Sequence, residues 1–173
     1  MKIITLSIAV LILTISCEKD NELVFSGITE RDEFAVPKGS TDDTDWRFDD
    51  IWNEREEGLF DLSNFKSADK FYEEMNYSTD LYAVSSCMAY PNPAVSVFNF
   101  NINSEADTLR FVIVDNDYHI IFSKQIIGGI GLWMFDSSNR DNFKLNSVYR
   151  IYYKLLYLDG SVERGHGDVK IID

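Results

Sequence analysis

Histidine and cysteine are scarce in this 173-residue chain, which has two of each. Two histidines exclude a histidine-rich zinc site, and two cysteines exclude a disulfide framework. The chain also lacks a His-Glu-x-x-His motif, a Gly-x-Ser-x-Gly nucleophile elbow and a phosphate-binding loop, because the glycines from Gly128 to Gly131 have no lysine after them. We therefore expect no cofactor, no metal ion and no catalytic activity.

Positive charge is scarce as well. The chain has 16 Lys and Arg residues against 29 Asp and Glu residues, which gives a formal net charge of -13. An acidic surface repels nucleic acid and anionic lipid head groups. We expect no nucleic-acid partner, and any membrane attachment must use something other than a basic patch.

Long apolar runs are limited to the segment from Ile3 to Ile15. A membrane-spanning helix needs about 20 apolar residues, so this shorter run, with Lys2 before it, predicts a signal peptide at residues 1–16. The alternative is an uncleaved hydrophobic anchor. Ser16-Cys17 resembles the lipobox of bacterial lipoproteins, in which the cysteine is acylated. This resemblance implies lipidation at Cys17, with residues 17–43 as lipid anchor and tether.

The charged run from Glu18 to Glu22 resembles the acidic, lysine-containing export signal of Bacteroidota lipoproteins. That resemblance implies a lipid-anchored protein on the outer face of the outer membrane. The alternative is a solvated tether with no role in sorting.

Residues 44–82 have apolar side chains at helical spacing, and we expect them to form a helical segment. The pattern predicts an amphipathic helix of about a dozen residues that begins after a Thr44 N-cap and ends near Gly58. A second helical turn is predicted from Ser67 to Met75. The apolar residues of the first helix are Trp46, Phe48, Ile51, Trp52, Leu59 and Phe60.

From residue 83 to residue 173 the apolar residues alternate instead, which is typical of strands with one buried face. Asp115-Asn116-Asp117 and Asp159-Gly160 are hairpin signals. Phe100 and Tyr153 are predicted core residues, and Cys87 a small buried residue. Gly165-His166-Gly167 predicts a bulge with His166 pointing outward. About seven short strands indicate a mainly β fold, an antiparallel sandwich preceded by a short helical segment.

The segment Tyr90-Pro91-Asn92-Pro93-Ala94, with the two hairpins after it, resembles the C-terminal Ig-like modules of secreted Bacteroidota proteins. Those modules are similar to the flagellar-hook-capping Ig-like domain and to type IX secretion sorting domains. The resemblance implies an Ig-like β-sandwich at residues 83–173.

Three aromatic residues are candidates for ligand binding: Trp133, Trp46 and Tyr152. An exposed aromatic ring can stack on a sugar or a peptide, but aromatic residues at these spacings are also typical of a core. The polar loop from Asp136 to Asp141 resembles a calcium loop in composition. However, Arg140 stands where an oxygen ligand is required, so a solvated loop is the alternative.

We therefore expect a non-enzymatic surface lipoprotein that serves as an accessory binding module. Its partner would be a nutrient, either a glycan or a peptide, or an outer-membrane transporter complex. One alternative is a structural lipoprotein of the cell envelope that assembles through its sheet edges. Another is an enzyme of unfamiliar type that uses Asp and Glu pairs.

Overall fold

The computed structural model describes residues 22–65 and 85–173. Within these two ranges, no helix has the length and apolarity that a membrane span requires. The predicted signal peptide, Cys17 and the second predicted helical turn all lie outside the described residues.

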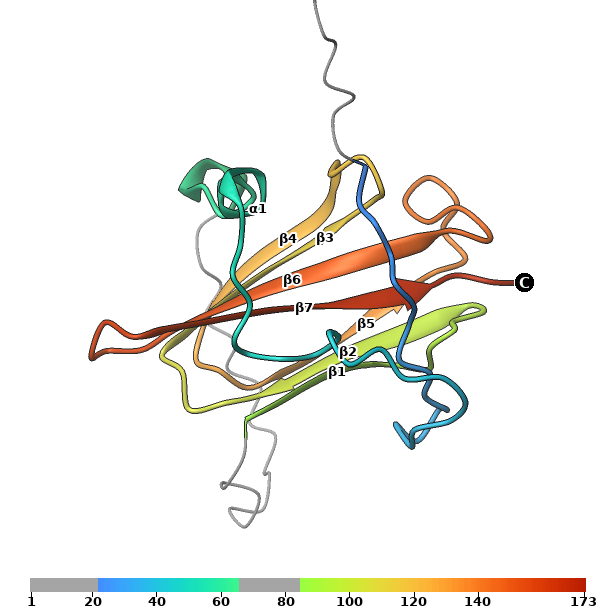
Figure 1. Ribbon diagram of the computed structural model, residues 1–173, viewed down its shortest axis with the longest axis horizontal. Helices are drawn as coiled ribbons and strands as arrows, with labels where there is room; N and C mark the ends of the chain where they lie inside the picture. The colour runs from blue at the N-terminus through green and yellow to red at the C-terminus, as the bar shows by residue number, and fades with distance from the viewer. Residues whose placement is uncertain (1–21, 66–84) are drawn as a thin grey trace, which may run out of the picture.

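The described chain forms two antiparallel sheets packed face to face (Figure 1). One sheet has the order β1-β2-β5 and the other the order β4-β3-β6-β7. This distribution of seven strands between two sheets is typical of immunoglobulin-like sandwiches, and it confirms the predicted fold class. The strands are β1 (Ser86–Tyr90), β2 (Val97–Asn103), β3 (Thr108–Val114), β4 (Ile120–Ile127), β5 (Gly131–Asp136), β6 (Val148–Leu156) and β7 (Val162–Lys170).

The sandwich interior follows from the alternation in the sequence. In β2, the side chains of Phe98, Phe100 and Ile102 have no exposed area, while the residues between them are half-buried. Tyr153 of β6 lies opposite them in the same core cluster and is also fully buried. Phe100 and Tyr153 are therefore core residues, as predicted.

The two ends of the segment 22–65 pack on the outer face of the four-stranded sheet and create a second apolar cluster. Trp52 stacks on Phe60, with ring centroids 4.8 Å apart, and meets Tyr152 of β6 edge-on at 5.6 Å. Leu23 and Leu59 complete the cluster on the side of the segment. Strand β6 is consequently buried on both of its faces.

The predicted helix from residue 45 to residue 58 is wrong except for its last turn. The observed helix α1 spans Glu54–Gly58, and its N-cap is Asn53, whose side chain accepts from the backbone N–H groups of the first turn. A 3-10 helix, η1 (Leu62–Asn64), follows.

The residues before α1 run in extended form along the edge of β7 (Figure 1). The Trp46 N–H donates to the His166 carbonyl, and the Asp50 N–H donates to the Arg164 carbonyl at 3.1 Å. The Phe48 carbonyl accepts from the Arg164 N–H at 3.3 Å. The open edge of β7 thus supplies backbone hydrogen-bond partners to this segment. Helical propensity is a local property and contains no information about these partners.

The predicted bulge at Gly165-His166-Gly167 is also wrong, because β7 pairs with β6 in unbroken register through these residues. A Cβ at Gly167 would collide with the Trp46 ring, and a Cβ at Gly165 would collide with the Arg47 carbonyl. The glycines therefore allow the N-terminal segment to approach β7 closely. His166 is half-buried, bonded to Asp50 and next to Tyr152, instead of pointing into solvent.

Candidate functional site

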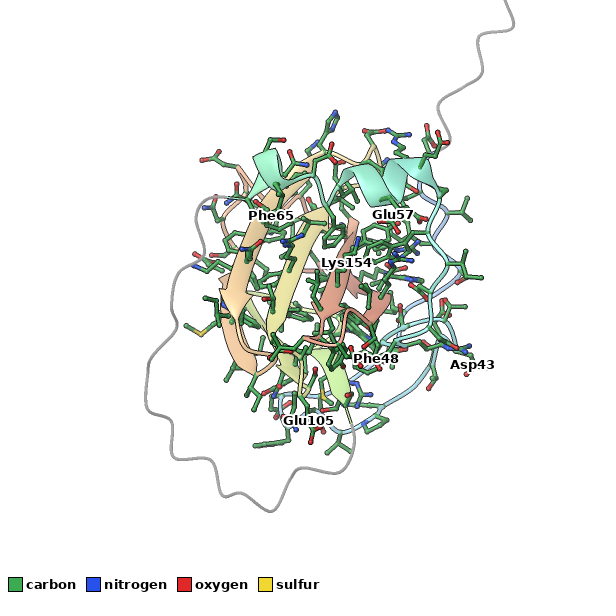
Figure 2. All side chains as sticks on the ribbon, turned by 90° about the vertical axis from the view of Figure 1, so that its left-hand side faces the viewer. Asp43, Phe48, Glu57, Phe65, Glu105 and Lys154 are labelled. Carbon is green, nitrogen blue, oxygen red and sulfur yellow. The ribbon has the colours of Figure 1, made fainter. Side chains whose placement is uncertain are left out.

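A cleft of about 420 Å³ lies between the N-terminal segment and strand β1. The cleft is shallow and open to solvent over much of its area. Figure 2 shows Asp43 and Phe48 of this cleft in the lower part of the molecule, away from Glu57 and Phe65. The lining residues are Thr29, Arg31, Thr41, Asp42, Asp43, Asp45, Trp46, Phe48, Ser85, Ser86, Cys87 and Met88.

Asp45 fixes the wall of the cleft to the sandwich. One carboxylate oxygen of Asp45 accepts the Thr29 N–H at 2.8 Å, and the other accepts the Asp168 N–H at 2.9 Å. The Thr29 hydroxyl in turn accepts the Asp42 N–H at 3.2 Å. These bonds hold residues 29, 42 and 45 of the segment in one place.

Burial and the nearby Asp168 carboxylate raise the pKa of Asp45, the two N–H donors only partly oppose them, and the resulting pKa is about 6. A carboxyl whose folded pKa exceeds its unfolded value stabilises the fold most when it is protonated. This contribution is complete below about pH 3.8 and is lost as the pH rises through about 6. At neutral pH, Asp45 adds negative charge beside the cleft.

A buried ion pair lies behind Asp45. The Arg150 guanidinium donates from two nitrogens to the two oxygens of Asp168, each at 2.7 Å. Burial alone would lower the pKa of Arg150, but the bonds to Asp168 outweigh burial and raise it, so the guanidinium stays charged. The pair fixes β7 to β6 beneath the N-terminal segment.

Asn92 stands between two prolines in the motif that resembles Ig-like modules. It connects the N-terminal segment to strand β7. Its buried side-chain amide donates to the carbonyls of Thr29 at 2.9 Å and Asp168 at 2.8 Å. Its side-chain oxygen accepts the Lys170 N–H at 3.0 Å. Sequence reasoning did not identify this role, although a polar residue enclosed by two prolines is a signal of a fixed turn.

Two buried donors in the cleft wall have no hydrogen-bond partner among the described residues. They are Nε1 of Trp46 and Nε of Arg31. Trp46 is only 9% exposed, so solvent reaches little of it. A buried N–H without an acceptor is uncommon and destabilising. Neither nitrogen is accessible although the cleft is open, so a ligand in the cleft would not reach them. Trp52 Nε1 and Ser137 Oγ also lack partners, but neither residue lines the cleft.

The three aromatic residues predicted for ligand binding do not share a groove. Trp46 lies in the cleft wall. Tyr152 has no exposed area, and its hydroxyl donates to Glu56 at 2.8 Å in the outer cluster. Trp133 is half-buried and packs against Phe111, with ring centroids 4.8 Å apart. Tyr152 and Trp133 therefore contribute to packing, which was the core alternative considered for them.

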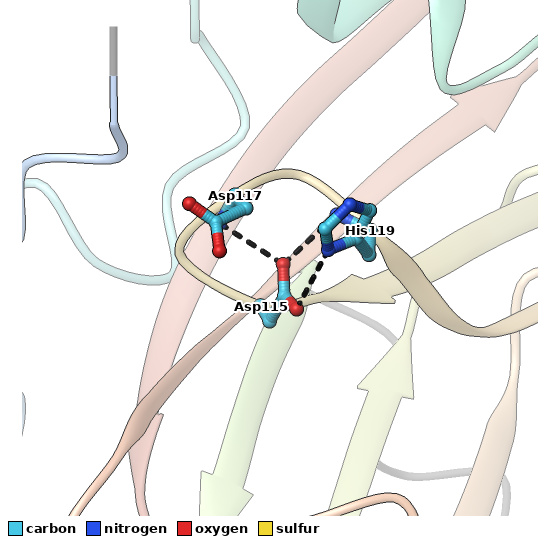
Figure 3. A group of neighbouring side chains, drawn as sticks. All are labelled: Asp115, Asp117 and His119. Atoms are coloured by element: carbon cyan, nitrogen blue, oxygen red, sulfur yellow. Dashed lines mark hydrogen bonds and ion pairs between the residues drawn. The ribbon is translucent and has the colours of Figure 1, made fainter. Parts of the chain in front are cut away.

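The β3–β4 hairpin holds a group of possible metal ligands, Asp115, Asp117 and His119, whose ligand atoms lie within 4.8 Å of one another (Figure 3). One Asp115 oxygen accepts the N–H groups of Asp117 and His119, both at 2.9 Å. Burial opposes ionisation of Asp115, but these donors and the His119 ring outweigh it and lower its pKa. The hydrogen bonds of the turn are sufficient to explain the positions of these side chains.

The loop that resembles a calcium site is likewise held by its own bonds. Asp136 accepts from the Ser138 N–H at 2.9 Å, and Arg140 donates to the Ser137 carbonyl at 2.8 Å. A cationic side chain thus takes a carbonyl oxygen of this loop that a calcium ion would otherwise use.

Compared with known proteins, the chain matches no protein-family model and no curated protein.

Proposed function

We propose that this chain is a lipid-anchored, non-catalytic binding module on the outer-membrane surface. Its ligand, a nutrient glycan or peptide or a segment of an outer-membrane partner, occupies the cleft beside β1. The observation that carries the proposal is the cleft itself, whose wall combines the exposed Asp43 carboxylate with the side chains of Arg31 and Trp46. A concave surface with a few polar groups beside aromatic side chains is the usual form of a binding site.

The cleft favours binding over catalysis because its inner carboxylates are already in use. Asp45 accepts two backbone N–H groups, and Asp42 accepts from the Ser26 and Thr44 side chains. General acid–base chemistry on two carboxylates requires both to reach the reacting atoms. Asp43 remains as the exposed carboxylate of the cleft.

The start of the described chain supports an orientation for the anchored protein. The Leu23 N–H donates to the Asn116 carbonyl at 3.0 Å, so the chain enters the domain at the β3–β4 hairpin. That hairpin lies at the top of Figure 1, whereas β1 lies at the bottom. A lipid on Cys17 would hold the hairpin near the bilayer, since an extended chain spans at most about 3.6 Å per residue. The cleft would then face away from the membrane.

Lipidation predicts a clear biochemical result. The protein should incorporate labelled palmitate, and Cys17→Ala should abolish both the incorporation and the membrane association, since stable anchoring requires acyl chains. Protease added to intact cells should degrade the anchored protein if it is displayed on the surface. Palmitate incorporation that persists in Cys17→Ala would refute lipidation at this residue.

Binding without turnover is the second expected result. The protein purified in detergent should bind a glycan, a peptide or a co-expressed membrane protein, and should hydrolyse none of its ligands. Arg31→Met should weaken the binding about tenfold or more, because it removes a donor from the cleft. Turnover that a single Asp or Glu substitution abolishes would instead establish the enzyme alternative.

A specific surface also favours the assembly alternative. Strand β5 is an edge of its sheet, and its side chains Leu132 and Met134 are exposed. An edge strand with exposed apolar side chains can pair with strands of other chains. If partner capture depends on this edge, Met134→Lys should abolish it and Arg31→Met should leave it unchanged.

A further inference from the structure

Strand β1 is an edge of the three-stranded sheet, and its outer edge is open. It pairs with β2 alone, in unbroken register from Ser86 to Tyr90. Among the described residues, no other segment makes a backbone hydrogen bond to residues 85–90. The N–H and C=O groups on the outer side of β1 therefore have no backbone partner within residues 22–65 and 85–173. An edge strand in this state can accept a further strand.

The cleft runs along this open edge of β1. Successive side chains of a strand point to opposite faces of the sheet. The consecutive residues Ser86, Cys87 and Met88 nevertheless all line the cleft, although Cys87 is a buried core residue and its two neighbours are half-buried. The edge is the part of a strand that adjoins both faces, so a ligand in the cleft has access to the backbone of β1.

Strand β1 also lacks the features that protect two other edges of the sandwich. The edge of β7 is covered by the N-terminal segment, and the edge strand β4 carries Lys124. Lysine, proline and β-bulges are the usual means by which an edge strand is kept from pairing with other chains. The sequence of β1 is Ser-Cys-Met-Ala-Tyr, and its register with β2 has no bulge. Its edge is therefore suited to pairing.

The opposite wall of the cleft determines which charge the ligand carries. Three carboxylates and one guanidinium line the cleft: Asp42, Asp43, Asp45 and Arg31. Burial opposes ionisation of Asp42, but hydrogen bonds from two hydroxyl groups outweigh it and lower its pKa. Asp43 is exposed and makes no hydrogen bond or ion pair with the other described residues. Together with the net charge of -13, this wall attracts cations and repels anions.

Resting on the binding role proposed above, we infer that the ligand of the cleft is an extended, positively charged segment of another protein. The segment adds to β1 as a further strand, about 4.8 Å away, and its backbone bonds to the open edge. Its lysine or arginine side chains reach Asp42 and Asp43, and one of its carbonyl groups accepts from the Arg31 guanidinium. Backbone pairing supplies the affinity, and the acidic wall distinguishes cationic from anionic segments.

The test uses three capped octapeptides and the protein purified in detergent. One peptide alternates valine with lysine, and its anionic counterpart alternates valine with glutamate. Titration calorimetry at low ionic strength should give a Kd below about 1 mM for the lysine peptide and binding at least about tenfold weaker for the glutamate peptide. The third peptide is the lysine peptide with N-methyl groups on two consecutive central residues, whose N–H groups point to opposite edges. It keeps the charge but loses the pairing, so it should bind about tenfold more weakly or worse.

Hydrogen exchange measured by NMR locates the bound peptide. The amides of Ser86–Tyr90 that do not bond to β2 should exchange more slowly when the lysine peptide is bound. The amides of β5, which is the other edge of the same sheet, are the internal control and should exchange at an unchanged rate.

A pair of variants tests the acidic wall. Asp43→Lys should weaken binding of the lysine peptide about tenfold or more, because it replaces attraction by repulsion within the cleft. Asp141→Lys on an exposed loop is the matched control, since it makes the same change in net charge outside the cleft. The control should weaken binding by less than about threefold, because salt screens distant charges.

Several results would overturn the inference. Equal binding of the lysine and N-methylated peptides, or protection of β5 in place of β1, would refute strand addition at this edge. Equal effects of Asp43→Lys and Asp141→Lys would refute the role of the acidic wall. If the lysine peptide does not bind, but an oligosaccharide or a co-expressed membrane protein binds without protecting β1, the inference is wrong and the proposed function stands. If none of these ligands binds, both are wrong.

Discussion

Replacing Phe100 with alanine should lower the free energy of unfolding by about 3–5 kcal/mol. Phe100 has no exposed area and lies at the centre of an aromatic group. Its ring centroid is 4.9 Å from that of Phe111, 5.8 Å from that of Trp133 and 6.3 Å from that of Tyr153. Truncation removes these contacts from both sheets and leaves a cavity that a packed interior cannot close.

Urea denaturation followed by circular dichroism measures this change. Leu158→Ala is the control, because Leu158 is 91% exposed at the β6–β7 turn and its truncation should alter stability by less than about 0.5 kcal/mol. A loss below about 1 kcal/mol for Phe100→Ala would show that the two sheets do not pack as described.

The second large effect is expected at the buried ion pair. Asp168→Asn should destabilise the fold by about 3–5 kcal/mol, because it leaves the charged Arg150 guanidinium buried without a counter-ion. Asp168 is 1% exposed, so water cannot replace the lost carboxylate. The same denaturation experiment measures the change.

A double-mutant cycle distinguishes the lost charge from a general packing defect. Adding Arg150→Met to Asp168→Asn removes the unpaired charge, so the double variant should recover part of the loss, by about 1 kcal/mol or more. Strictly additive losses would show that the pair contributes no interaction energy of its own.

The strands were predictable because their pattern is local. In β2, buried apolar residues alternate with half-buried ones along seven consecutive positions, and this alternation identifies the buried face without knowledge of the partner strand. The two residues Asp159-Gly160 are likewise sufficient to predict the hairpin between β6 and β7. Gly160 has the positive φ, 86°, that such a turn requires. The two-sheet fold follows from the number of such segments.

The N-terminal segment was not predictable from its own pattern. Trp46 and Trp52 stand at spacings that suit a helix, yet Trp46 belongs to the sandwich core and Trp52 to the outer cluster. The segment is extended because the edge of β7 offers backbone partners, and because Gly167 leaves room for the Trp46 ring. These causes lie far along the chain, where a local window cannot detect them.

The candidate site was found only in part for the same reason. Trp46 was identified from its residue type, which favours binding surfaces. Arg31 and Asp43 belong to a segment that reads as a polar tether, and only the folded chain brings them beside β1. Their place in the cleft wall depends on how the N-terminal segment packs, which is a property of the three-dimensional structure.

The contact between the N-terminal segment and β7 has a consequence for the timing of folding. Asp50 and His166 are 116 positions apart, and Asp45 and Asp168 are 123 positions apart. Strand β7 follows the other six strands in the chain, so the N-terminal segment has no edge to pair with until β7 has been made. Folds that depend on such distant pairings form slowly. For the exported lipoprotein proposed here, that delay would leave the N-terminal segment undocked until the whole domain has crossed the inner membrane.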